Sequence, residues 1–223
     1  MLTEIQKMWQ IFAVSKDSVL ELRALWPKGS GENRAPVFRH FITANYPSIP
    51  KMKEAFETAA LDLNRRGFNI YTPMNPIRSD FTGPGCVKDS DIAFRDLLLI
   101  DIDRLGDTSQ PANQVELDEA EALATVVEQA LSDEGWGQPI KMMSGNGFHL
   151  YFVLDDVPNE EESTELIRDT LHNLAEQFNT GTMGIDTTVS NASRITKMAG
   201  TIMTKGIETA DRPYRMARVV ESE

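Results

Sequence analysis

Apolar and polar residues alternate along residues 18–26, and this period of two predicts a half-buried β-strand. Over residues 49–67 the apolar positions recur every three to four residues, which predicts a helix that ends at Gly67. The run 68–74 predicts a further strand, and residues 2–12 predict a short amphipathic helix. The first part of the chain therefore combines helices and strands.

The same patterns continue beyond a loop expected at residues 76–90. The apolar run 96–102 predicts a buried strand, and residues 140–154 predict two strands joined by a glycine turn. Helices are expected at 114–132 and 160–179, and short strands and turns from Gly184 onward. The expected apolar faces are Leu123, Val126, Val127, Ala130 and Leu131 in the first helix, and Leu166, Ile167, Leu171, Leu174 and Phe178 in the second.

This element order predicts an α+β fold in one domain over residues 1–223. An N-terminal α/β module would span 1–93, and a β-α-β-β-α-β module would span 94–223. The composition agrees with a globular protein, because 41% of the residues are hydrophobic and 25% are charged. No stretch approaches the about 18 apolar residues of a membrane span, and the N-terminus lacks a signal-peptide pattern.

Cysteine content and charge narrow the classes of protein to which this chain could belong. The single cysteine, Cys86, excludes an internal disulfide and a cysteine-built zinc site, and favours a reducing, cytoplasmic location. The net charge of -12 argues against nucleic acid, but 17 acidic and 3 basic residues lie within 101–169, whereas 187–220 holds 6 basic and 2 acidic residues. Since salt confines each charge to about 8 Å, a local basic tract can still bind phosphates.

Two carboxylates end the strand at 96–102. Residues two apart on a strand share a face, so Asp101 and Asp103 project together while Ile100 and Ile102 point into the core. Two nearby carboxylates repel unless a cation neutralises them, and Mg²⁺ or Mn²⁺ prefers such oxygen ligands. The alternative is a strand end at which both acids face water.

A glycine turn and a basic segment add candidates for phosphate binding. Ser144 and His149 flank the turn Ser-Gly-Asn-Gly, whose backbone N–H groups together with a hydroxyl and an imidazole suit a phosphate chain. A tight hairpin with a pairing histidine is the alternative. Asp186 could complete a three-carboxylate site for two metal ions, and Arg194 and Lys197 supply cations; alternatively Asp186 caps a turn and both cations face solvent.

The segments "IDID", "SGNGFHLYF" and "IDTTVSNASRITKMAGT", taken together, resemble the three motifs of the archaeo-eukaryotic primase superfamily, in particular its primase-polymerase members. Those motifs are h-D-h-D, s-G-x-G-x-H, and an apolar-acidic pair leading to a basic segment. The resemblance covers residues 94–220 closely. Upstream the resemblance is looser, and the sequence there is similar to the N-terminal half of phage, plasmid and CRISPR-associated members.

The resemblance implies a catalytic core in which an RRM-like module (94–223) packs against the N-terminal module (1–93), with the active-site cleft between them. It implies two-metal catalysis with Mg²⁺ or Mn²⁺ held by Asp101, Asp103 and Asp186. Contacts to the incoming nucleotide are expected from Ser144, Gly145, His149, Arg194, Lys197 and Asn75, with Tyr71 as a weaker candidate. The nucleic-acid path is expected along Arg212, Arg215 and Arg218, although a strand with a basic face would have the same pattern.

The implied activity is synthesis and extension of primers on a single-stranded DNA template from NTPs or dNTPs, with release of pyrophosphate. Implied partners are a helicase, other replication or CRISPR proteins, or domains of a longer chain; no membrane is involved. Two alternatives stay open: a gap-filling or translesion polymerase that has lost priming, and an RRM-like nucleic-acid-binding module without catalysis. The second predicts exposed aromatic residues on the sheet, where this sequence has acids, serine and histidine.

Overall fold

The computed structural model describes residues 2–29 and 31–220. Its helices are α1 (Glu4–Met8), α2 (Ile49–Arg65), α3 (Gln114–Asp133) and α4 (Glu161–Phe178), with short 3₁₀ turns at Thr43–Asn45 and Asp89–Asp91. Its strands are β1 (Val19–Leu25), β2 (Val37–Ile42), β3 (Asn69–Pro73), β4 (Phe94–Arg104), β5 (Ile140–Met143), β6 (Phe148–Pro158), β7 (Met183–Ile185), β8 (Ile195–Lys197), β9 (Ile202–Met203), β10 (Arg215–Met216) and β11 (Arg218–Val220).

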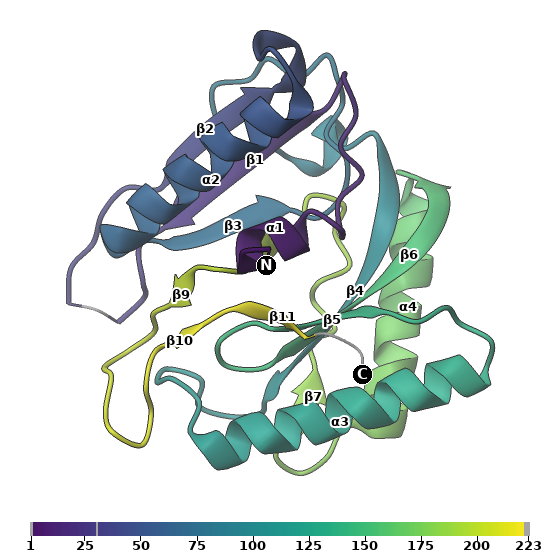
Figure 1. Cartoon of the computed structure of the whole chain (residues 1–223). Coiled ribbons are helices and arrows are strands. Elements are labelled where there is room, and N and C mark those ends of the chain that lie inside the picture. The colour runs from purple at the N-terminus through teal and green to yellow at the C-terminus, as the bar shows by residue number, and fades with distance from the viewer. Residues whose placement is uncertain (1, 30, 221–223) are drawn as a thin grey trace.

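The C-terminal part contains an antiparallel sheet with the strand order β11-β5-β6-β4-β7. Its strands β4 to β7 and helices α3 and α4 follow the order β-α-β-β-α-β, as the sequence predicts. Both helices pack on this sheet (Figure 1), because each places an apolar stripe toward it. The stripe of α3 consists of Leu117, Ala120, Leu123, Ala124, Val127 and Leu131.

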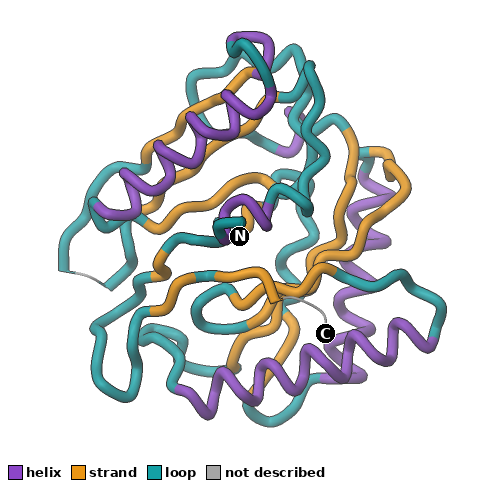
Figure 2. Tube along the Cα trace, in the orientation of Figure 1, coloured by secondary structure: helices purple, strands orange, loops and turns teal. Residues whose placement is uncertain are grey.

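A second sheet has the order β2-β1-β3-β8 and carries α2. Figure 2 shows this layer above the C-terminal sheet. Strand β8 comes from the C-terminal part of the chain but pairs with β3, so the boundary expected at residue 93 does not separate the two sheets. A strand from the C-terminal part of the chain consequently completes the N-terminal sheet.

Helix α1 and the small β9-β10 sheet lie between these layers. The Trp9 indole packs edge-on against Phe56 of α2 and donates to Glu57. On the other side, the Glu4 carboxylate accepts the backbone N–H of Val219 in β11, 3.0 Å away. The N-terminal helix thus contacts elements of both layers.

Several expected elements differ in the structure. The helix expected at residues 2–12 is confined to Glu4–Met8. Strand β2 was not expected, because apolar and polar residues do not alternate clearly along it. Val126 and Leu166, expected on buried helix faces, are 54% and 66% exposed, because each lies outside the stripe of buried residues on its helix. Within the described residues, no helix is long and apolar enough to cross a membrane.

Candidate active site

Asp101 lies at the centre of the arrangement, between two other candidate residues. In the sheet it pairs with His149 of β6, and on its other side the N–H of Asp186 donates to the Asp101 carbonyl at 2.8 Å. Directly paired residues of an antiparallel sheet project from the same face. The fold therefore brings His149 and Asp186 to Asp101, although they follow it by 48 and 85 positions along the chain.

Asp103 lies one step farther along β4, on the same face. Its partner on β7 is Gly184, and Gly147 of the turn also lies beside it, so neither neighbour adds a side chain there. Burial raises the pKa of Asp103, and the nearby Asp101 carboxylate raises it further. For Asp101, burial also raises the pKa, but attraction to His149, Arg194 and Lys205 outweighs it and the net pKa is lowered. The pKa values of the two neighbouring acids are therefore shifted in opposite directions.

The three carboxylates have the chemistry of a site for Mg²⁺ or Mn²⁺, which prefer oxygen ligands. One oxygen of each is engaged: Asp101 Oδ1 lies 3.4 Å from His149 Nε2, Asp103 Oδ1 accepts the Arg104 N–H, and Asp186 Oδ1 accepts both the N–H and the hydroxyl of Thr188. The second oxygens contact no donor within residues 2–29 and 31–220. As they stand, however, no three His, Cys, Asp or Glu side chains of that part form a group that could hold a metal ion.

His149 is held in place by two hydroxyl groups. Its Nδ1 lies 2.9 Å from the Tyr151 hydroxyl and 3.2 Å from Thr196 Oγ1, and those two hydroxyls also bond to each other. Thr196 belongs to β8 of the other sheet, so this buried triangle joins both layers behind the histidine. The Nε2 edge is left to face Asp101.

The glycine turn between β5 and β6 depends on Ser144. Its N–H and hydroxyl both contact the Gly147 carbonyl, and the Gly147 N–H points back to the hydroxyl at 3.3 Å. Gly145 has φ +112°, and a Cβ there would lie 2.5 Å from Met203 Cβ of β9. Ser144 and Gly145 therefore shape the turn beside the acids.

The two basic candidates of the third motif are placed differently. Arg194 Nη2 donates to the Thr188 carbonyl, while its buried Nε has no partner among the described residues. Lys197 is 3% exposed, and its Nζ donates to Thr201 and to the Ile202 carbonyl. Burial lowers its pKa to about 7. Tyr71 lies next to this ammonium, and burial together with Asp101 raises the pKa of Tyr71 to about 12.

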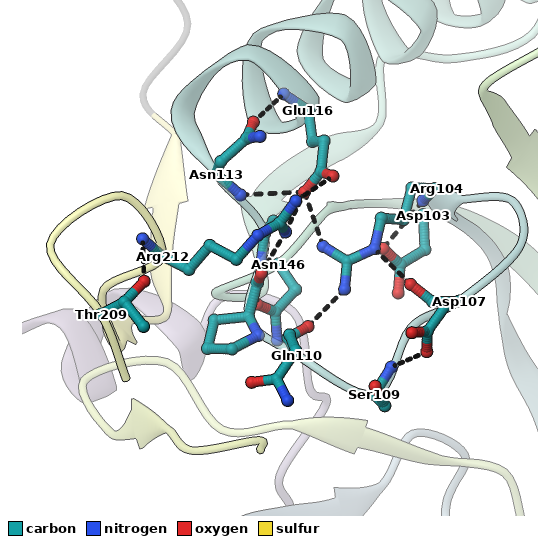
Figure 3. A network of polar contacts seen from close by, with 12 residues as sticks. Asp103, Arg104, Asp107, Ser109, Gln110, Asn113, Glu116, Asn146, Thr209 and Arg212 are labelled. Carbon is teal, nitrogen blue, oxygen red and sulfur yellow. Dashed lines mark hydrogen bonds and ion pairs between the residues drawn. The ribbon is translucent and has the colours of Figure 1, made fainter. Parts of the chain in front are cut away.

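Three of the remaining four candidates are engaged in contacts within the protein. Asn75 is buried, donates to the Ala192 carbonyl and accepts the N–H groups of Asp96 and Leu97, which ties β4 to the loop before β8. Arg212 forms a double ion pair with Glu116, as Figure 3 shows. Arg215 donates to the Ala112 carbonyl, and Arg218 is exposed on the edge strand β11.

Sequence reasoning missed three residues of this region. Tyr151 lies two positions after His149 on one strand, so the strand period could have identified it. Thr196 lies within the basic segment that contains Arg194 and Lys197. Lys205 belongs to the β9–β10 connection. The sequence marks it only as one of the six basic residues of 187–220, although its charge acts on Asp101 and Asp103.

Comparisons with known proteins support the architecture. No family model matches this sequence, and no curated protein is significantly similar to it. Among solved structures, the polymerase domain from Mycobacterium tuberculosis Ligase D in complex with DNA is similar, with a TM-score of 0.51 and 17% sequence identity over 90% of this chain and 75% of that chain. At this identity the likeness concerns the fold. The chain therefore has a mixed α/β fold similar to that of a polymerase domain.

Proposed function

We propose that this chain is a metal-dependent primase-polymerase, which synthesises primers and extends them on a DNA template from NTPs or dNTPs and releases pyrophosphate. The observation that carries the proposal is the position of Asp101 between His149 and Asp186, with Asp103 on the same face. The fold supports it, because the similar polymerase domain was solved with DNA.

Asp101, Asp103 and Asp186 would hold the divalent ions through the carboxylate oxygens that face no donor. Such ions would activate the attacking 3′-hydroxyl and neutralise the pyrophosphate leaving group. Because Asp186 Oδ1 accepts two hydrogen bonds from Thr188, we expect its side chain to reorient when all three acids share an ion. Burial and the neighbouring Asp101 carboxylate both raise the pKa of Asp103, and a divalent cation bound between the two acids would offset both effects.

The other residues would bind and orient the nucleotide. His149, fixed by Tyr151 and Thr196, presents Nε2 beside Asp101, where it can donate to a phosphate oxygen. The unpartnered Nε of Arg194 offers a further donor. Lys197, whose pKa is about 7, would gain charge as a phosphate approached.

A template assay distinguishes this proposal from its alternatives. The protein is incubated with labelled nucleotides and Mn²⁺ on a bare single-stranded DNA and on the same DNA with an annealed primer. Products on both substrates support a primase-polymerase, and products only from the primer indicate a gap-filling or translesion polymerase. DNA binding without products indicates a non-catalytic module.

The matched variant is Asp101→Asn, which keeps the side-chain size but removes the charge. We expect it to abolish synthesis while circular dichroism and thermal unfolding remain those of a folded protein. Full activity in this variant would reject the assignment of the acids, whatever the wild-type protein synthesises.

A further inference from the structure

Residues 204–214, here called the strap, connect β9 with β10 and are attached to both layers. At one end the Thr204 N–H donates to Asn69 Oδ1 of β3 at 2.8 Å. Farther along, the Ile207 N–H donates to Gln110 Oε1 at 2.9 Å, and the Tyr214 hydroxyl donates to the Gly206 carbonyl at 2.8 Å. The backbone on both sides of Lys205 is therefore fixed.

Lys205 is the cation that this strap contributes to the site. It is half-buried, and among the described residues its ammonium forms neither a hydrogen bond nor an ion pair. Its charge nevertheless acts on Asp103, Asp101 and Asp107. A lysine placed near several carboxylates without contacting any of them remains available, as a compact positive charge, for a phosphate that metal ions held by those carboxylates would bring there.

Glu116, near the start of α3, connects the strap to the end of β4 (Figure 3). Its Oε2 accepts Arg104 Nη1 and Arg212 Nη1, both at 2.7 Å, and its Oε1 accepts Arg212 Nη2 at 2.8 Å. Arg104 directly follows Asp103 and donates its backbone N–H to that carboxylate. Glu116 thus binds both Arg104, which follows the candidate metal ligand Asp103, and Arg212 of the strap.

This junction requires a negative charge at position 116. Two guanidinium groups converge on the same oxygen, and without the carboxylate they would face each other uncompensated. The hydrogen bonds from Arg212 and burial act in opposite directions, and the net pKa of Glu116 is lowered to about 2, so the acid stays ionised at neutral pH. The Asn113 N–H, which also donates to Oε2, fixes the side chain against α3.

We propose that Glu116 is a positioning residue, which holds the strap through Arg212 and the end of β4 through Arg104, so that Lys205 binds the phosphates of the incoming nucleotide. The inference rests on the proposed function. It adds a phosphate-binding residue and the acid that orients it, both outside the three motifs.

The test compares nucleotide dependence of primer extension in Glu116→Gln, Lys205→Ala and the double variant. Glu121→Gln is the control, since Glu121 is exposed on the same helix and has no contact with the strap. We expect Glu116→Gln and Lys205→Ala each to raise the nucleotide KM by about five- to tenfold, as when a charge-assisted contact is lost. The control should match the wild type.

The double variant shows whether Glu116 affects nucleotide binding through Lys205. If Glu116 acts through Lys205, the double variant has the KM of Lys205→Ala alone. Multiplied effects of the two substitutions, or an unchanged KM in Glu116→Gln, overturn the inference.

Hydrogen exchange of the strap gives a measurement that does not depend on catalysis. Amides of residues 204–214 should exchange faster in Glu116→Gln than in Glu121→Gln, with β4 and β6 unchanged. If the wild type makes no product, the proposed function fails, yet faster exchange still supports the positioning role and equal exchange rejects it.

Discussion

Lys197 is a buried lysine that hydrogen-bonds only to neutral oxygens. Its Nζ contacts Thr201 Oγ1 and the Ile202 carbonyl, and no carboxylate of the described residues pairs with it. Removing an ammonium from water without a counter-charge is costly, which is why burial lowers its pKa from 10.5 to about 7. The end of β8 therefore carries a buried amine beside the Tyr71 ring, and this amine gains or loses its charge near neutral pH.

We predict that Lys197 makes stability depend on pH. The folded pKa of about 7 lies below the unfolded value of 10.5, so between these values the unfolded chain binds more protons and stability rises with pH. Lys197→Met should lack this rise and should exceed the wild type most at or below pH 7. Urea unfolding at pH 6 and pH 9.5 measures the difference, and parallel curves for the two proteins would contradict it.

Residues of the site differ in how far the sequence could predict them. Asp101 and Asp103 follow from the period of a strand, and His149 from the turn that precedes it. That Asp186 lies beside Asp101 depends on the pairing of β7 with β4, which no local pattern specifies. Lys205 depends on a connection attached at both ends by side chains, and such contacts leave no trace in spacing.

At the scale of elements, the turn between β5 and β6 shows how closely backbone approaches backbone at this site. A Cβ at Gly147 would lie 2.1 Å from the Ile102 carbonyl oxygen and 3.3 Å from Asp103 Cα. No side-chain movement can relieve a contact with backbone, so the glycine is required by packing. It keeps β4 and β6 in the register that pairs Asp101 with His149.

We therefore predict that Gly147→Ala destabilises the protein by on the order of 3 kcal/mol or more, the range of backbone strain and overpacking. Gly137→Ala is the control, because a Cβ there meets nothing within 4 Å. Urea denaturation measures both, and equal midpoints for the two variants would show that the turn can relax.

Elements with strong periodicity were predicted best. The helices expected at 49–67, 114–132 and 160–179 are α2, α3 and α4, and the strand at 96–102 is the centre of β4. Strand β2 was not expected, since its "VFRHFI" has little alternation and its burial comes from β1 and α2. Strand β8 is three residues long and exists only because β3 pairs with it.

At the scale of the whole molecule, β8 and the hydroxyl pair of Tyr151 and Thr196 join the two sheets behind His149. The layers are thus connected at the place where the proposed nucleotide site lies. The exposed surfaces of α3 and α4 are acidic and would repel a template. These exposed acids are Asp118, Glu119, Glu121, Asp133, Glu161, Glu162, Glu165, Asp169 and Glu176.

We predict that the joint between the sheets contributes measurably to stability. Tyr151→Phe and Thr196→Val each remove one hydroxyl of the buried triangle and should each cost about 1–2 kcal/mol. Because both act on the same contact, the double variant should cost less than the sum. A double-mutant cycle by urea unfolding measures this, and strictly additive losses would show that the hydroxyls act independently.

The most direct test of the account is Mn²⁺ binding followed by electron paramagnetic resonance, with nucleotide present, in the wild type, Asp101→Asn, Asp186→Asn and the exposed control Asp17→Asn. The account predicts binding by the wild type and the control. It predicts affinity at least about tenfold lower in the other two variants, since even outer partners of metal ligands have effects of this size. Equal affinity in all four proteins, or none in the wild type, would contradict a metal site shared by acids from β4 and from the end of β7.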